Sequence, residues 1–181
     1  MLISKFSGDG ITEQIEAYGD LNDVKFPEQL RTFLEQYNGG ETPKTSFSCA
    51  GVSSDLRAFY GMGRVKYSYD SVKPISQNGK QYLPIALDSF GNEIVISVEE
   101  GQIYFWDHEN GSITWIAAAL RDFFQACRSE KINPAARKTI QEREQDLIKR
   151  GKGSVITDAL RAMWQAEIDK YGTLNQEEVR L

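Results

Sequence analysis

The hydrophobic positions of residues 27–37 follow the period of a helix. Apolar side chains recur there every three or four residues and share one face: Leu30, Phe33, Leu34 and Tyr37. Pro27 suits the first helical position, and Asn38 followed by two glycines predicts the stop, because these residues tolerate positive φ. A weaker pattern predicts a shorter helix around residues 12–18.

Short apolar runs separated by turn sequences fill the next part of the chain. We predict four strands, of which the last is short: residues 81–87, 93–98, 102–106 and 113–116. Turns as short as these join neighbouring strands as hairpins, so the pattern predicts an antiparallel meander. Pro84 has no backbone N–H, and the first strand is therefore expected to lie at a sheet edge or to begin there.

Helical spacing returns after the meander. The apolar positions of this second helix are Leu120, Phe123, Phe124 and Cys127. Helices packed against an antiparallel sheet form an α+β domain, which we predict over residues 1–127, with a mostly antiparallel sheet flanked by helices.

Residues 128–181 show helical patterns only and are predicted to form a helical C-terminal extension. Asn133-Pro134 is a suitable start for a helix that runs to Arg150. A further helix is expected from Ser154 to Tyr171.

The sign of the net charge also changes at the boundary after residue 127. The 181 residues include 21 Lys+Arg and 26 Asp+Glu, for a net charge of −5. Residues 1–127 hold 10 basic and 17 acidic residues, net −7, whereas residues 128–181 hold 11 and 9, net +2. No basic tract resembles a nucleic-acid-binding surface.

The sequence also gives an expectation for the cellular compartment of the protein. The longest uncharged run, residues 110–120, is far shorter than the roughly 18 residues of a membrane span. The first ten residues lack a signal-peptide pattern, and two cysteines do not make a secreted disulfide framework. We therefore expect a cytoplasmic protein that binds neither membrane nor nucleic acid.

Candidate catalytic residues are few. The sole histidine, His108, lies between Asp107 and Glu109, and the two cysteines provide no metal-ligand spacing. Any nucleophile–base pair would depend on this one imidazole. We expect no catalytic site and no metal. A hydrolase or metal enzyme built on these three residues is the least favoured alternative.

Residues 88–93, Asp-Ser-Phe-Gly-Asn-Glu, superficially resemble a calcium loop. They do not keep the EF-hand register, because glycine arrives early and phenylalanine occupies a ligand position. The favoured interpretation is a tight hairpin turn in which Gly91 and Asn92 have positive φ and Asp88 caps its own backbone.

Several of these segments, in this order, resemble the SUKH superfamily, which includes yeast cell-wall-synthesis regulators and many bacterial immunity proteins. The segments are Phe26-Pro27, Tyr37-Asn38-Gly39-Gly40, Phe59-Tyr60-Gly61, the run from Leu83 to Ile94 and the run from Gly101 to Glu109. The resemblance covers about residues 12–127, and the extension has no counterpart in the family core.

The resemblance implies an α+β fold and a non-enzymatic role without cofactor. Bacterial members usually bind and block a cognate polymorphic toxin, often a nuclease or deaminase, and we expect that function here. The family also includes regulatory members. The alternative is therefore a regulatory or scaffold module without a toxin partner, in which the extension is the docking element.

An acidic domain would be attracted to a basic nuclease. The expected contact residues lie near the ends of adjacent hairpins: Tyr60, Asp88, Glu93, Trp106, Asp107 and Glu109. Taken singly, each is at least as well explained as an ordinary turn or core residue.

Overall fold

The structure is a computed structural model that describes residues 1–133, 138–172 and 175–181. It divides into two units. The core unit comprises residues 1–131 and 176–181, and the helical unit comprises residues 132–175. Among the residues described, no helix is both long and apolar enough to cross a membrane.

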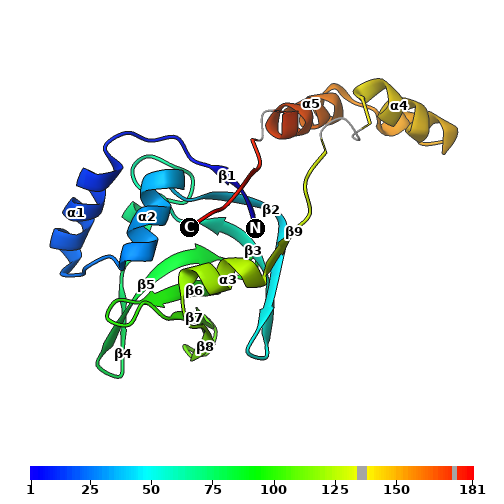
Figure 1. The fold of residues 1–181 in the computed structure, drawn as a ribbon. Helices are drawn as coiled ribbons and strands as arrows, with labels where there is room; N and C mark the ends of the chain where they lie inside the picture. The colour runs from blue at the N-terminus through cyan, green and yellow to red at the C-terminus, as the bar shows by residue number, and fades with distance from the viewer. Residues whose placement is uncertain (134–137, 173–174) are drawn as a thin grey trace. The chain divides into compact units, whose positions relative to one another are not determined.

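The core unit is built around one antiparallel sheet (Figure 1). Its strands lie in the order β10 (Glu177–Glu178), β1 (Leu2–Lys5), β2 (Gly40–Cys49), β3 (Val52–Phe59), β5 (Lys80–Leu87), β6 (Glu93–Ser97), β7 (Ile103–Trp106) and β8 (Ile113–Ala117). Two further strands pair outside this order: β4 (Ile75–Gln77) with β5, and β9 (Cys127–Ser129) with β2.

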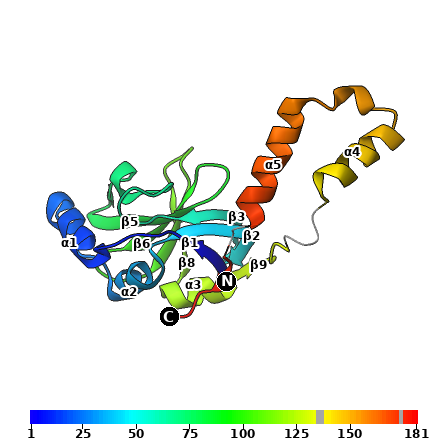
Figure 2. The same ribbon diagram turned by 90° about the horizontal axis from the view of Figure 1, so that it is seen from above.

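Helices α2 (Glu28–Tyr37) and α3 (Leu120–Ala126) lie on one side of the sheet (Figure 2). The predicted apolar stripe of α2 is buried, and the helix ends at Asn38 with φ 49°. The ring of Phe33 lies 5.1 Å from that of Phe59 in β3 and 5.3 Å from that of Phe124 in α3. This aromatic cluster joins two helices to the sheet and confirms the predicted α+β class.

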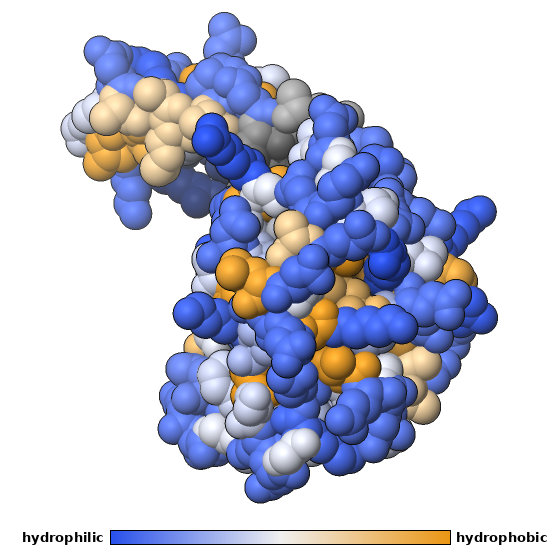
Figure 3. All heavy atoms as spheres, turned by 90° about the vertical axis from the view of Figure 1, so that its left-hand side faces the viewer, coloured by the Kyte–Doolittle hydropathy of each residue, from blue (hydrophilic) through white to orange (hydrophobic). Residues whose placement is uncertain are grey.

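The remaining helical elements of the core unit are α1 (Ile11–Asn22), which is longer than predicted, and the single 3-10 turn η1 (Tyr69–Ser71). Figure 3 views the molecule from the α1 side. The surface of the core unit there is mostly hydrophilic, with separate apolar areas between the charged side chains.

The predicted meander is confirmed, since β5, β6, β7 and β8 pair in sequence order. The expectation that Pro84 marks an edge strand is wrong. β5 is interior, with β6 on one side and both β3 and β4 on the other. β4 pairs only with residues 80–82, and β3 only with residues 86–87. Pro84 falls in the gap between them, where a missing N–H costs no ladder bond on that side.

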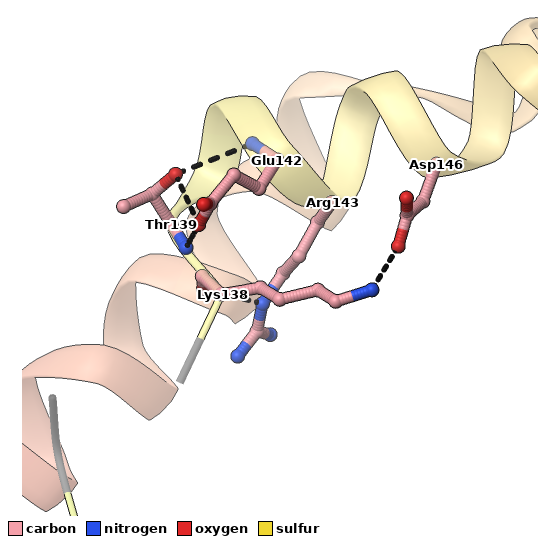
Figure 4. Close-up of polar contacts among 5 residues, drawn as sticks. All are labelled: Lys138, Thr139, Glu142, Arg143 and Asp146. Atoms are coloured by element: carbon pink, nitrogen blue, oxygen red, sulfur yellow. Dashed lines mark hydrogen bonds and ion pairs between the residues drawn. The ribbon is translucent and has the colours of Figure 1, made fainter. Parts of the chain in front are cut away.

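The helical unit contains α4 (Ile140–Lys149), the 3-10 turn η3 (Gly153–Val155) and α5 (Asp158–Gly172). A capping box begins α4: Thr139 Oγ1 accepts from the backbone N–H of Glu142, whose carboxylate accepts from the N–H of Thr139 at 2.8 Å (Figure 4). This helix starts later than predicted, and Pro134 lies outside the described residues. Ser154 belongs to the 3-10 turn, so α5 also begins later than expected.

No described residue of the helical unit is buried. Its two helices are joined by ion pairs, Arg143 to Glu167 at 2.9 Å and Arg161 to Glu144 at 2.6 Å. Partly exposed ion pairs of this kind contribute little stability, and the described residues of this unit form no buried apolar core.

The end of the chain returns to the core unit. β10 pairs with β1, and the backbone N–H of Arg180 donates to the hydroxyl of Tyr37 at 3.0 Å. Residues 128–131 also belong to the core unit, because β9 pairs with β2. The predicted boundary lies after residue 127. In the structure the core unit continues to residue 131 and also includes residues 176–181.

This arrangement predicts unequal effects for the same substitution at two sites. Val179 is 8% exposed beside β10, whereas Val155 in the helical unit is 50% exposed. We expect Val179→Ala to lower the free energy of unfolding by about 1 to 2 kcal/mol, as two buried methyl groups are lost. Val155→Ala should change it by less than about 0.5 kcal/mol. Urea unfolding measures both, and equal effects would contradict docking of the C-terminal segment.

Candidate partner-binding site

The turn between β5 and β6 is organised by the carboxylate of Asp88. This side chain is 1% exposed and accepts four hydrogen bonds, each of 2.8 Å. The donors are Ser54 Oγ, the backbone N–H groups of Phe90 and Asn92, and Asn92 Nδ2. The expected cap by Asp88 is thus confirmed. Gly91 has the expected positive φ of 92°, whereas Asn92 is not among the positive-φ residues.

The β5–β6 turn contacts the β7–β8 turn through Asn92. Its Nδ2 is committed to Asp88, which leaves Oδ1 directed at the other turn. Oδ1 accepts from the backbone N–H of His108 at 3.3 Å and lies 3.0 Å from His108 Nδ1. Since an amide oxygen only accepts, this contact assigns the ring proton to Nδ1. The sole histidine therefore links two turns.

The β7–β8 turn is closed by Asp107. Its carboxylate accepts from the backbone N–H of Glu109 and from Asn110 Nδ2, both at 2.9 Å. The backbone of Asp107 also donates to the carbonyl of Ser112 at 3.0 Å. Within the described residues, no group of three metal-binding side chains is suitably placed around this turn or elsewhere.

Glu93, the first residue of β6, lies opposite Trp106 in the register and accepts from the hydroxyl of Tyr60 at 2.9 Å. Burial raises the pKa of Glu93, although the Tyr60 hydrogen bond opposes this. Burial and the nearby Glu93 carboxylate also raise the pKa of Tyr60. The Tyr60 ring packs 5.9 Å from that of Tyr69, which is fully buried, so Glu93 is flanked by a buried tyrosine cluster.

The structure brings the six expected residues together, but they differ in exposure. Tyr60 and Asp88 are buried, and a partner reaches neither without rearrangement. Glu93, Trp106 and Asp107 are half-buried, and the side chain of Glu109 is exposed: the accessible part of the site is therefore the β7–β8 turn with the end of β7. Their role in binding stays a prediction.

Sequence reasoning missed the residues that join β3 to the turns. Ser54 donates to Asp88, and the Asp55 carboxylate accepts from the backbone N–H of Ser89 at 3.0 Å and from its hydroxyl. These pairs lie 34 positions apart in the chain. No local pattern marks such pairs, because they depend on β3 lying beside β5.

Comparison with known proteins supports the resemblance seen in the sequence. A family model described as SMI1 / KNR4 family (SUKH-1) matches residues 12–126, which is more than half of the chain. The matched range includes both turns and all six residues. No curated protein and no solved structure matches the chain.

The raised pKa of Glu93 predicts a pH effect on stability. The folded protein holds this proton more tightly than the unfolded chain, so the stabilising contribution is present below the ordinary glutamate pKa. It is lost as pH rises through the folded value. Relative to Glu93→Gln, the natural protein should therefore become less stable from about pH 4 to pH 7.

Urea unfolding across this pH range measures the difference. Glu109→Gln removes the same charge at an exposed position and should leave the pH profile of the natural protein unchanged. A Glu93→Gln profile that runs parallel to the natural one would show that burial does not disfavour the ionised carboxylate.

Proposed function

This chain belongs to the SMI1/KNR4 family (SUKH-1), and on that premise we propose that it is a non-enzymatic immunity protein. It binds a cognate bacterial polymorphic toxin in the cytoplasm and blocks its activity. The observation that carries the proposal is the pair of interlocked turns, which present Trp106, Asp107 and Glu109 at one end of the meander.

Preorganisation of this end favours binding. The Asp88 and Asp107 carboxylates already accept the turn N–H groups, and Asn92 ties one turn to the other. A partner then does not have to order these loops, which lowers the entropic cost of association. Family membership and a fixed acidic, aromatic surface together favour contact over catalysis.

Charge supports a basic partner. The core unit holds 13 Lys+Arg and 20 Asp+Glu, for a net charge of −7. Enzymes that act on nucleic acid carry basic surfaces, to which a domain of this charge is attracted over several ångströms. Such attraction raises the association rate and excludes acidic partners more than it sets affinity. A nuclease or a nucleic-acid deaminase is therefore the favoured toxin class.

Charge reversal at the β7–β8 turn tests the proposed contact surface. We expect the double variant Asp107→Lys, Glu109→Lys to bind the toxin encoded beside its gene at least tenfold more weakly. The loss should combine slower association, which shrinks as salt is added, with faster dissociation, because Asp107→Lys also removes the carboxylate that closes the turn. Surface plasmon resonance at two salt concentrations measures both rates.

The matched control is the double variant Glu28→Lys, Asp122→Lys, which changes the net charge equally on α2 and α3. It should retain nearly the affinity of the natural protein. Equal losses in the two double variants would assign the effect to net charge and would place the contact surface elsewhere.

One observation favours the alternative of a regulatory or scaffold module. Large apolar side chains of the helical unit are exposed at Ile148, Val155 and Met163, and none of its described residues is buried. Small helical hairpins of this kind gain stability by docking an apolar face on a partner.

Excision of residues 132–175 separates the two functions. Replacing them with a short Gly/Ser linker retains β9 and β10, which truncation after residue 127 would remove. The immunity proposal expects the excised protein to keep its fold by circular dichroism and its toxin affinity within about threefold. Loss of partner binding by a folded core would favour the alternative.

A further inference from the structure

β8 forms a free edge of the sheet. It pairs with β7 and with no other strand among the described residues. The backbone N–H of Asp107 donates to the carbonyl of Ser112, so the pair Phe105 and Thr114, two residues further along, is hydrogen-bonded as well. By the same alternation, the backbone N–H and C=O groups of Ile113 and Trp115 point away from β7.

The sequence of β8 does not protect this edge. Natural edge strands are commonly blocked by lysine, proline, a bulge or a covering element. β8 reads Ile-Thr-Trp-Ile-Ala and lies within the longest uncharged run of the chain. It contains neither a charge nor a proline. Its register with β7 shifts once, beyond Trp115, so the regular part of the edge runs from Ile113 to Trp115. The side chain of Trp115 is 46% exposed. An uncharged, β-branched and aromatic edge is a template for another strand.

An aromatic strip lies directly behind the edge. Trp115 is the register partner of Tyr104, and Ile113 is the partner of Trp106. These are the closer, non-hydrogen-bonded pairs, whose side chains contact most directly. The ring of Tyr104 in turn lies 5.2 Å from that of Tyr82 on β5. Side chains of an added strand would therefore meet aromatic surface.

We propose that β8 is the docking edge for an extended segment of the partner, which joins the sheet as an additional strand. The inference rests on the proposed function and specifies how that partner binds. The segment has apolar side chains at alternate positions, facing the aromatic strip. It also carries Lys or Arg at the end beside Asp107 and Glu109, which border β8 where the strand begins.

A partner segment is favoured over a second copy of this chain. Two core units, each with net charge −7, repel each other, whereas a basic segment is attracted.

A random library of displayed twelve-residue peptides, selected on the full chain, provides a probe that does not require the toxin. We expect the selected peptides to alternate apolar with polar residues and to include Lys or Arg. As synthetic peptides they should slow hydrogen exchange at the amides of Ile113 and Trp115. Failure to select any peptide, or protection confined to other segments, would overturn the proposal.

Two variants test the edge itself. Trp115→Lys adds the natural protection against strand pairing, and Ile113→Pro removes an outward N–H that β7 does not use. Both should weaken peptide binding at least tenfold, by fluorescence anisotropy. The control Leu21→Lys alters another exposed apolar residue, 84% exposed on α1, and should stay within twofold of the natural protein. If the β8 variants and Leu21→Lys lose equal peptide affinity while keeping native circular dichroism, β8 is not the docking edge.

Sedimentation and toxin binding complete the test. If the natural protein sediments as a dimer and Trp115→Lys sediments as a monomer, β8 binds a second copy of the chain, and the proposal is overturned. A toxin that binds Trp115→Lys as tightly as the natural protein overturns the strand addition and leaves the proposed function standing. Peptide binding at β8 without any toxin binding would instead refute the proposed function alone.

Discussion

The buried carboxylate of Asp88 is the interaction on which this end of the molecule depends. A charge removed from water is tolerated only when hydrogen bonds replace its hydration, and Asp88 accepts four. These bonds fix Ser54 on β3 and the whole β5–β6 turn. Through Asn92 they also fix the orientation of His108 in the next turn. One side chain therefore connects β3, β5 and β6 directly and reaches the β7–β8 turn through Asn92.

The sequence predicted the elements whose own pattern is strong. The buried stripe of α2 and the runs of β5 to β8 have a clear period and clear turns between them. The β2–β3 hairpin lacks such a signal, because buried Pro43 and Thr45 interrupt its apolar alternation. β10 is even less visible, since Glu177 and Glu178 form a strand only because β1 lies beside them. The start of α4 had a readable signature, Thr139 followed by Glu142, which the Asn-Pro sequence upstream obscured.

For the candidate site, the sequence could predict which residues lie close together but not which side chains are exposed to solvent. Hairpin connectivity alone places Glu93 near Trp106 and Asp107. Whether a side chain faces solvent depends on what packs over it, and both Ser54 and Tyr60 come from a distant part of the sequence. Asp88 was therefore expected at the surface and is found inside, where it supports the residues that a partner can reach.

The positions of β9 and β10 have a mechanical consequence. The chain leaves the core unit through β9, paired with β2, and re-enters it through β10, paired with β1. In the sheet order, β3, β5, β6 and β7 separate β2 from β8. A pulling force on the helical unit would load the β1–β2 end of the sheet first, so that end would yield while the meander stayed intact.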